Sequence, residues 1–197
     1  DVITLGNHSL RRPEIADFLD ENEFIIRPCN YHSSAPGNGS VILDKGKNRV
    51  AIINLQGAVY LDNIINPFDS IDDEIKKVKD DGANIIIIDF HAEATGEKKG
   101  MGFYLDGKVS AVFGTHTHTQ TADEQILPNG TGYITDIGMT GPYYSVLGVT
   151  PEVAIQKMKT NLPVRFTNPD GPCTLEGIVI EIDETTGKTT HIERFRK

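Results

Sequence analysis

Apolar residues gather into three short runs that are typical of buried strands. The runs cover residues 1–5, 84–90 and 109–113, and positions 85–88 are all isoleucine. Strands that are hydrophobic on both faces occur in parallel sheets covered by helices on both sides. The pattern therefore predicts an α/β fold built on a parallel sheet.

Other segments predict helices and further strands around this sheet. Ser70 is placed to cap one helix and Gly82 to end it, while Pro151 is placed to begin another. No linker or repeat divides the chain, so residues 1–197 are expected to form a single domain. Apolar spacing predicts helices over 12–20, 70–81 and 98–105, strands over 24–27, 40–43, 50–55, 175–182 and 189–195, and a hairpin over 126–134.

Polar residues follow each of the three apolar runs. Asn7 and His8 follow the first, His91 ends the second, and His116 and His118 follow the third. Ligands bind at the carboxyl ends of parallel strands, and side chains two residues apart in an extended segment point the same way. A lone histidine is more often a surface or core residue, but imidazole is also the commonest metal ligand. The shared position of the five residues predicts a metal site at this edge of the sheet.

The donor set restricts the kind of metal. The imidazoles of His91, His116 and His118 and the amide of Asn7 supply nitrogen and oxygen but no thiolate. This argues against a structural zinc site and suits manganese, iron or catalytic zinc. If Asn7 is a ligand, His8 beside it is placed to protonate a leaving group as a general acid.

Carboxylates are scarce at the predicted strand ends, where only Asp89 and Asp136 are found. A pair of metal ions normally requires bridging carboxylates. The chain also begins without Met, inside a predicted strand. We therefore expect the sequence to lack an N-terminal segment that supplies them; otherwise Asp89 and Asp136 are the positions to test.

Charge and composition exclude several classes of function. The net charge of −9 argues against a stable nucleic-acid partner, although metal ions could still attract a phosphate-bearing small molecule. The longest apolar run is too short to span a membrane. Cys29 and Cys173 form no paired motif, which favours a reducing, cytoplasmic location. A homo-oligomer is compatible with all of these observations.

Three motifs together resemble the calcineurin-like metallophosphoesterases, most closely the YmdB-type group of bacterial cyclic-nucleotide phosphodiesterases. They are Gly-Asn-His at 6–8, Asp-Phe-His-Ala-Glu at 89–93 and Gly-Thr-His-Thr-His at 114–118. The resemblance implies a layered β-sandwich flanked by helices and missing its N-terminal strands. It also implies two divalent metal ions, iron or manganese with zinc as an alternative. Similar stretches lie at 53–57, 91–95, 117–123, 133–142 and 159–166.

The resemblance also implies roles for individual residues. Asn7, His91 and His116 would hold one metal, His118 the other, and His8 would donate a proton to the leaving group. The implied reaction is attack of a metal-bound hydroxide on 2′,3′-cyclic nucleotides, with 3′,5′-cyclic nucleotides as a second substrate class. The family's earlier Gly-Asp and Gly-Glu-Asn blocks are absent from this sequence.

Two other classes of function compete with this interpretation. Metal-dependent amidohydrolases also use a His-x-His pair, but they need further His and Asp ligands downstream, where this chain offers only His191 in an unsuitable strand. A non-catalytic scaffold or regulatory protein that retains one metal is the second alternative. The family residues after Gly-Asn-His are usually aromatic and acidic, whereas Leu10 and Arg11 stand here. Metal content separates enzyme from scaffold, since the enzyme requires two equivalents.

Overall fold

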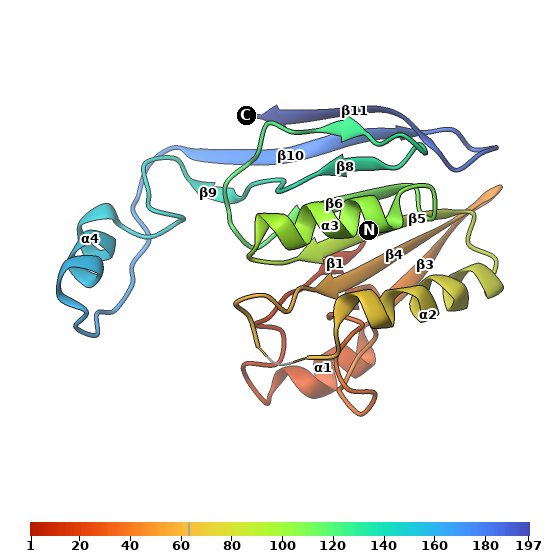
Figure 1. Ribbon diagram of the computed structural model, residues 1–197. Coiled ribbons are helices and arrows are strands. Elements are labelled where there is room, and N and C mark those ends of the chain that lie inside the picture. The colour runs from red at the N-terminus through yellow and green to blue at the C-terminus, as the bar shows by residue number, and fades with distance from the viewer. Residues whose placement is uncertain (63) are drawn as a thin grey trace.

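The computed structural model describes residues 1–62 and 64–197, and its largest unit is a six-stranded mixed sheet (Figure 1). Its strand order is β3-β4-β5-β6-β8-β7. Strands β4, β5, β6 and β8 run parallel, and β3 and β7 pair antiparallel at the two edges. The predicted α/β class is confirmed. The strands are β3 (Ser40–Lys45), β4 (Asn48–Gln56), β5 (Ile85–His91), β6 (Ala111–Thr115), β7 (Gln125–Ile126) and β8 (Gly132–Ile134).

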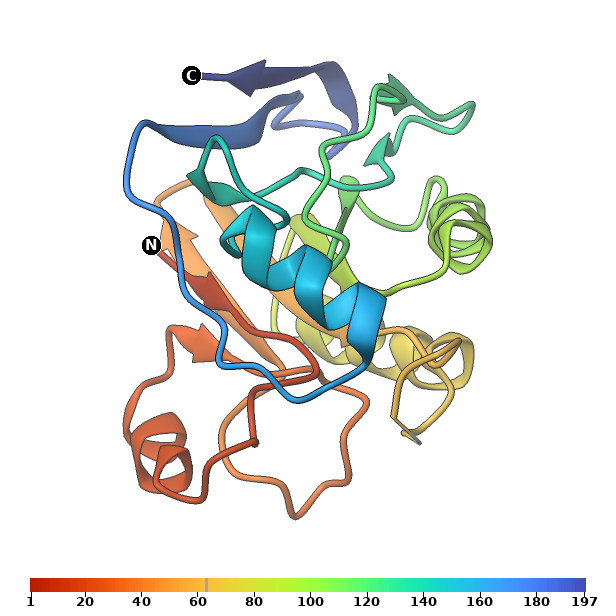
Figure 2. The ribbon, with the colours of Figure 1, turned by 90° about the vertical axis from the view of Figure 1, so that its left-hand side faces the viewer.

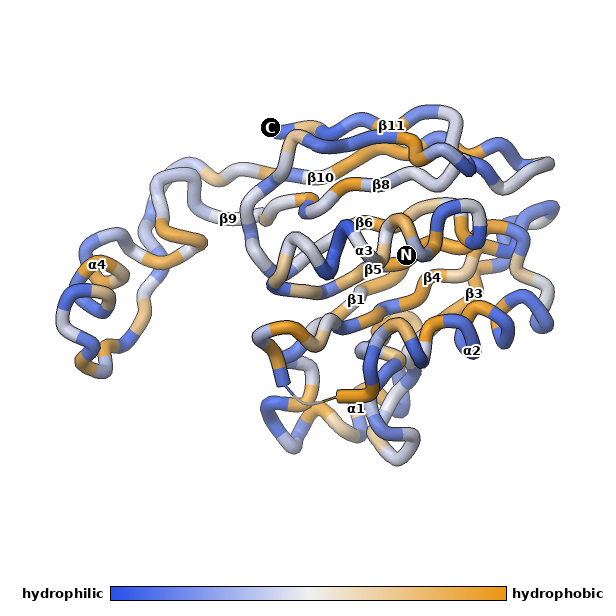
Figure 3. Tube along the Cα trace, in the orientation of Figure 1, coloured by the Kyte–Doolittle hydropathy of each residue, from blue (hydrophilic) through white to orange (hydrophobic). Residues whose placement is uncertain are grey.

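The hydrophobic core lies between this sheet and two helices, α2 (Pro67–Asp80) and α3 (Thr95–Leu105), which share one face (Figure 1). Ile71 and Ile75 of α2 are buried there against residues such as Ile88 of β5. Figure 3 shows apolar segments in these strands and hydrophilic turns along the outside of α2. Burial of these aliphatic side chains stabilises the fold by about 1.5–3 kcal/mol each.

The opposite face of the sheet is polar near the carboxyl ends of β4 and β5. The parallel register places Asn54 beside Asp89 and Gln56 beside His91, and Asn54, Gln56 and Asp89 are buried. Helices on both faces were expected from the isoleucine run. Instead, the face opposite α2 and α3 carries the polar groups of the site, because the even spacing of Asp89 and His91 turns both toward that face.

A second, three-stranded antiparallel sheet has the order β11-β10-β9. It consists of β9 (Thr140–Pro142), β10 (Cys173–Ile182) and β11 (Thr189–Arg196). Gln120 ties it to the rest of the molecule by donating hydrogen bonds to the carbonyl oxygens of Ile137, Gly177 and Phe195. The two sheets form the expected layers (Figure 1). The hairpin of β10 and β11 was predicted, whereas β9 was not.

The helices differ from their predictions mainly at their first residues. Helix α2 begins at Pro67, one turn before Ser70, because Asn66 is the N-cap and its side chain accepts a hydrogen bond from the Phe68 N–H at 2.9 Å. Ser70 instead donates to the Pro67 carbonyl. The remaining helices are α1 (Ile15–Glu21) and α4 (Pro151–Thr160), and α3 begins three residues before the predicted start.

The first strand is the main topological correction. Strand β1 (Ile3–Thr4) pairs in parallel only with β2 (Ile25–Ile26), outside the six-stranded sheet.

Later in the chain, α4 stands beyond the carboxyl ends of the parallel strands (Figures 1 and 2). Among the described helices, none has both the length and the apolar character to cross a membrane.

Candidate metal centre

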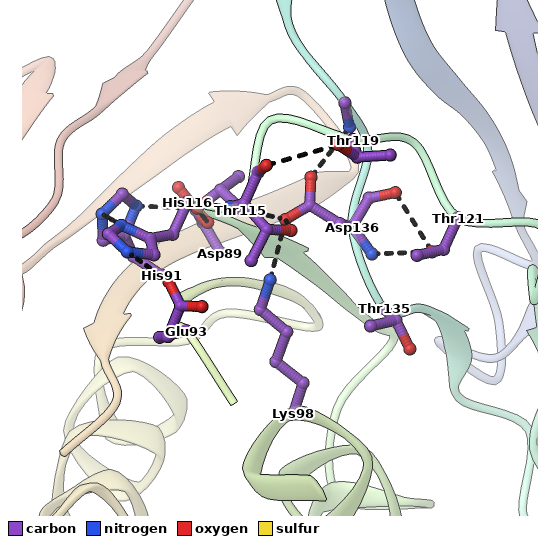
Figure 4. Close-up of polar contacts among 12 residues, drawn as sticks. Asp89, His91, Glu93, Lys98, Thr115, His116, Thr119, Thr121, Thr135 and Asp136 are labelled. Atoms are coloured by element: carbon purple, nitrogen blue, oxygen red, sulfur yellow. Dashed lines mark hydrogen bonds and ion pairs between the residues drawn. The ribbon is translucent and has the colours of Figure 1, made fainter. Parts of the chain in front are cut away.

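Three of the predicted ligands meet at the carboxyl ends of β5 and β6. His91 Nε2 lies 3.0 Å from Asn7 Oδ1 and 3.1 Å from His116 Nδ1. The two imidazole rings are nearly perpendicular, with centroids 4.8 Å apart (Figure 4). The structure therefore brings Asn7, His91 and His116 together, and their role as metal ligands stays a prediction.

The hydrogen-bond partners of His91 assign its proton to Nδ1. The Thr115 hydroxyl donates to Asp89 Oδ1 at 2.7 Å, so Thr115 Oγ1 can only accept from His91 Nδ1, which lies 3.0 Å away. Nε2 of His91 therefore carries a lone pair toward Asn7. This chain of carboxylate, hydroxyl and imidazole is the kind of outer shell that orients metal-ligating histidines.

Glu93 assigns the proton of the His116 ring in the same way. Its Oε2 lies 3.0 Å from His116 Nε2, which places the proton of a neutral His116 on Nε2 and a lone pair on Nδ1 (Figure 4). The lone pairs of Asn7 Oδ1 and His116 Nδ1 then both lie beside that of His91 Nε2, with no proton between the paired atoms. Ligands about 2.1 Å from one ion at right angles lie about 3 Å apart, so the donor set fits a divalent metal.

Burial and mutual proximity keep the site uncharged before metal binds. Burial, assisted by repulsion from His116, lowers the pKa of His91 to about 3. Burial also lowers the pKa of His116. Near neutral pH both rings are therefore neutral imidazoles, and a metal ion would not need to displace a proton from them. Within the described residues no three His, Cys, Asp or Glu side chains gather as ligands, since the third donor is the amide of Asn7.

Asp89 is completely buried at the base of the site, and burial raises its pKa to about 6 against the lowering effect of the Thr4 and Thr115 hydroxyls. It is thus ionised at neutral pH and accepts from Thr115, while the Asn54 amide lies 3.3 Å from its other oxygen. Because both oxygens are engaged below the histidines, the idea that Asp89 supplies a bridging ligand gains no support from this geometry.

Asp136 is engaged even more fully. It forms an ion pair with Lys98 at 2.7 Å, and both side chains are almost fully buried. The same oxygen accepts from the backbone and hydroxyl of Thr117, and Oδ1 accepts from the Gly138 N–H. Asp136 therefore holds the turn that carries His116 and His118.

That turn corrects the reason given for the convergence of the two histidines. Strand β6 ends at Thr115, and both His116 (φ 96°) and His118 (φ 60°) have left-handed backbones. The pair is therefore not aligned by alternation along a strand, because the chain turns where Thr117 binds Asp136.

At Gly6, a Cβ atom would lie 2.3 Å from the His91 ring, so only glycine lets the chain bring Asn7 this close.

His8 and His118 lie at the exposed rim of the site. Among the described residues, no hydrogen bond joins either side chain to Asn7, His91 or His116. His118 follows His116 by two residues and lines an adjoining cavity. Its role as a ligand of a second metal, and that of His8 as proton donor, remain predictions.

Residues that support the site were missed at the sequence level. Thr115 and Glu93 gave no recognisable signal, because their partners lie on other strands or loops. Lys98 did carry a signal in the sequence, since it shares the inner face of α3 with Met101 and Leu105. A lysine on an apolar stripe must find a buried partner, and here the partner is Asp136.

Comparison with known proteins places the chain in a family. The family described as YmdB-like protein matches residues 1–195. The chain is 50% identical over 195 residues to the 2′,3′-cyclic-nucleotide 2′-phosphodiesterase of Bacillus subtilis, covering 99% of this chain and 74% of that protein. It is 36% identical to a putative phosphatase/phosphodiesterase of Mycoplasma pneumoniae, with 100% and 71% covered.

Solved structures agree with this placement. A hypothetical protein from Thermus thermophilus superimposes with a TM-score of 0.92 at 34% identity, covering 100% of this chain and 76% of that one. A novel phosphatase from Mycoplasma pneumoniae gives 0.90 at 34%, with 100% and 71% covered. A putative 5′-nucleotidase from Staphylococcus aureus gives 0.57 at 18%, with 98% and 37% covered, and supports the fold alone. The expected phosphoesterase class is confirmed, and the chain belongs to the YmdB-like protein family.

Proposed function

We propose that this protein is a metal-dependent phosphodiesterase that hydrolyses nucleoside 2′,3′-cyclic phosphates, with 3′,5′-cyclic nucleotides as a second substrate class. The observation that carries the proposal is that Asn7 Oδ1 and His116 Nδ1 lie 3.0 and 3.1 Å from His91 Nε2, which brings three possible ligand atoms together. The name of the Bacillus subtilis relative supports the choice of substrate. A divalent cation is the partner that suits this arrangement of donors.

In the proposed site Asn7, His91 and His116 hold one metal ion and His118 contributes to a second. The ions are iron or manganese, with zinc as an alternative, and when bound they supply Lewis acidity and positive charge for the phosphate. This charge matters because the chain itself is strongly anionic, with a net charge of −9. The small nucleotide can then approach a protein that would otherwise repel it.

His8 is the proposed proton donor. Water adds to phosphorus and releases one proton to solvent, the P–O2′ bond breaks, and O2′ takes a proton from His8, leaving a nucleoside 3′-phosphate. His8 is exposed and adjacent to Asn7, so it can reach a leaving oxygen without being a ligand. A general acid contributes about 10²–10⁴-fold to the rate.

The main experiment compares His91→Ala with His191→Ala. His191 is a half-exposed residue of β11 outside the donor cluster and serves as the matched control. With manganese or iron supplied, we expect His91→Ala to lose bound metal and hydrolysis of adenosine 2′,3′-cyclic phosphate together, while His191→Ala keeps both. Unchanged metal content in His91→Ala would refute the proposed centre.

A second pair of variants separates ligand from acid. His118→Ala should lower metal content and turnover together. His8→Ala should keep its metal but lose turnover, and a loss of metal would show that the acid is wrongly assigned. Stoichiometric binding of one metal by the wild-type protein without hydrolysis of any phosphodiester would favour the alternative of a non-catalytic scaffold.

A further inference from the structure

A cavity of about 220 Å³ adjoins the candidate metal centre. His118 forms part of its wall, and the remainder comes from the loop after it and from the second sheet. Its volume suits a planar ring system better than a peptide or a polymer, since pockets for larger ligands usually exceed about 300 Å³. Residues that carry the argument are Met139, Pro142, Tyr143, Glu176 and Arg196.

Tyr143 and Arg196 form a fixed platform in this cavity. The Arg196 guanidinium lies over the Tyr143 ring, 5.2 Å from its centroid. Tyr143 directly follows β9, and its N–H donates to the Pro172 carbonyl at 2.9 Å. Arg196 is the last residue of β11, and its Nε lies 3.2 Å from Glu176 Oε1 on the neighbouring strand β10. Tyr143 is thus anchored through its backbone, and the Arg196 guanidinium through its pair with Glu176.

The charge balance indicates which part of a nucleotide fits here. Arg196 is already paired with Glu176, so the platform offers little net positive charge to a second phosphate group. The Tyr143 ring and the side chains of Met139 and Pro142 supply apolar surface. Aromatic rings and guanidinium planes are the groups on which nucleobases stack in proteins.

We propose that this cavity binds the nucleobase of the substrate, with Tyr143 and Arg196 as the stacking platform. The inference rests on the proposed phosphodiesterase function, because the phosphate must lie at the metal centre on the other side of His118. It makes Tyr143 a residue that determines preference for nucleotides over other phosphodiesters.

Adjacent tyrosines provide a matched test. Tyr144 is 72% exposed, packs edge-on against Tyr143 and does not line the cavity. The measurement is the ratio of kcat/KM for adenosine 2′,3′-cyclic phosphate to that for base-free 1-O-methylribose 2′,3′-cyclic phosphate. Tyr143→Ala should lower this ratio by about 5- to 100-fold, mainly through KM. Tyr143→Phe, which keeps the ring, and Tyr144→Ala should leave it within about twofold. An unchanged ratio in Tyr143→Ala overturns the proposal.

Calorimetric binding distinguishes failure of the subsite from failure of the proposed function. The wild-type protein should bind adenosine 3′-phosphate more tightly than methylribose 3-phosphate, and Tyr143→Ala should remove that difference. Hydrolysis without any dependence on Tyr143 retains the enzyme and refutes the subsite. Binding that depends on Tyr143 without hydrolysis of any diester retains the subsite and refutes the enzyme. Equal binding of both compounds by the wild-type protein refutes the subsite whatever the activity.

Discussion

The base and the rim of the candidate metal centre differ in how firmly they are held. The base consists of Asp89, Lys98, Thr115 and Asp136, whose polar groups are paired with one another or with neighbouring backbone. The rim consists of His8 and of residues 118–120, 143, 145 and 147, and most of its side chains are exposed. The difference indicates that the buried polar residues position His91 and His116, whereas the side chains of the rim are open to solvent.

Breaking the buried ion pair should have the largest effect. Lys98→Met leaves Asp136 charged and without its cation in a fully buried position, and the free energy of unfolding should fall by about 3–5 kcal/mol. Urea unfolding measures this change. Lys45→Met is the control, because its pair with Asp1 is exposed and is expected to contribute at most about 1 kcal/mol. Equal losses in both variants would contradict the distinction between base and surface.

Removing a single hydroxyl from the base should weaken metal binding. Thr115→Val keeps the shape of the side chain but leaves His91 Nδ1–H without its acceptor, and metal affinity should fall about 10- to 100-fold. Titration calorimetry with manganese measures the affinity. Thr119→Val, an exposed change on the rim, should have no such effect. The assigned tautomer of His91 is wrong if Thr115→Val binds metal as tightly as the wild type.

The pH dependence of stability should report the burial of His91. With a chelator present, the unfolded chain takes up a proton near pH 6.5 while the native ring, with its pKa near 3, does not. The contribution of His91 to stability is therefore lost as pH falls from about 6.5 to 3, with a slope of up to about 1.4 kcal/mol per pH unit.

Comparison with a variant isolates this contribution. Asp89, with its pKa raised to about 6, acts in the opposite direction, because its contribution to stability is lost as pH rises from about 4 to 6. Subtracting the slope of stability against pH of His91→Gln from that of the wild type cancels most of the Asp89 contribution. Equal slopes in the two proteins would show that His91 titrates normally in the native state.

The smallest effect is expected on the exposed helix α4. Met158 of α4 is 70% exposed, and Met158→Gln should change the free energy of unfolding by less than about 0.5 kcal/mol. Met101 of α3 is fully buried, and Met101→Ala should cost about 2–5 kcal/mol. A large loss in Met158→Gln would mean that α4 is covered in solution.

Local patterns predicted the elements whose burial repeats along the chain. The isoleucine run of β5, the hairpin of β10 and β11, and the apolar stripe of α2 all have a period that identifies them without knowledge of their neighbours. Strand β9 was missed because three residues are too few to show a period. The parallel-sheet rule also predicted the meeting of Asn7, His91 and His116, although it wrongly placed β1 in the main sheet.

The sequence by itself determined the α/β class, the parallel direction of β5 and which three residues converge, because these depend on hydrophobic period and on residue type. Only the tertiary structure decided which nitrogen of His91 and of His116 faces the cluster of donor atoms. That choice depends on Thr115, Asp89 and Glu93, which reach the rings through space. The left-handed turn at His116 was likewise decided by the tertiary structure, because the N–H of Thr117 donates a hydrogen bond to Asp136. Local sequence does not connect Asp136 to this turn.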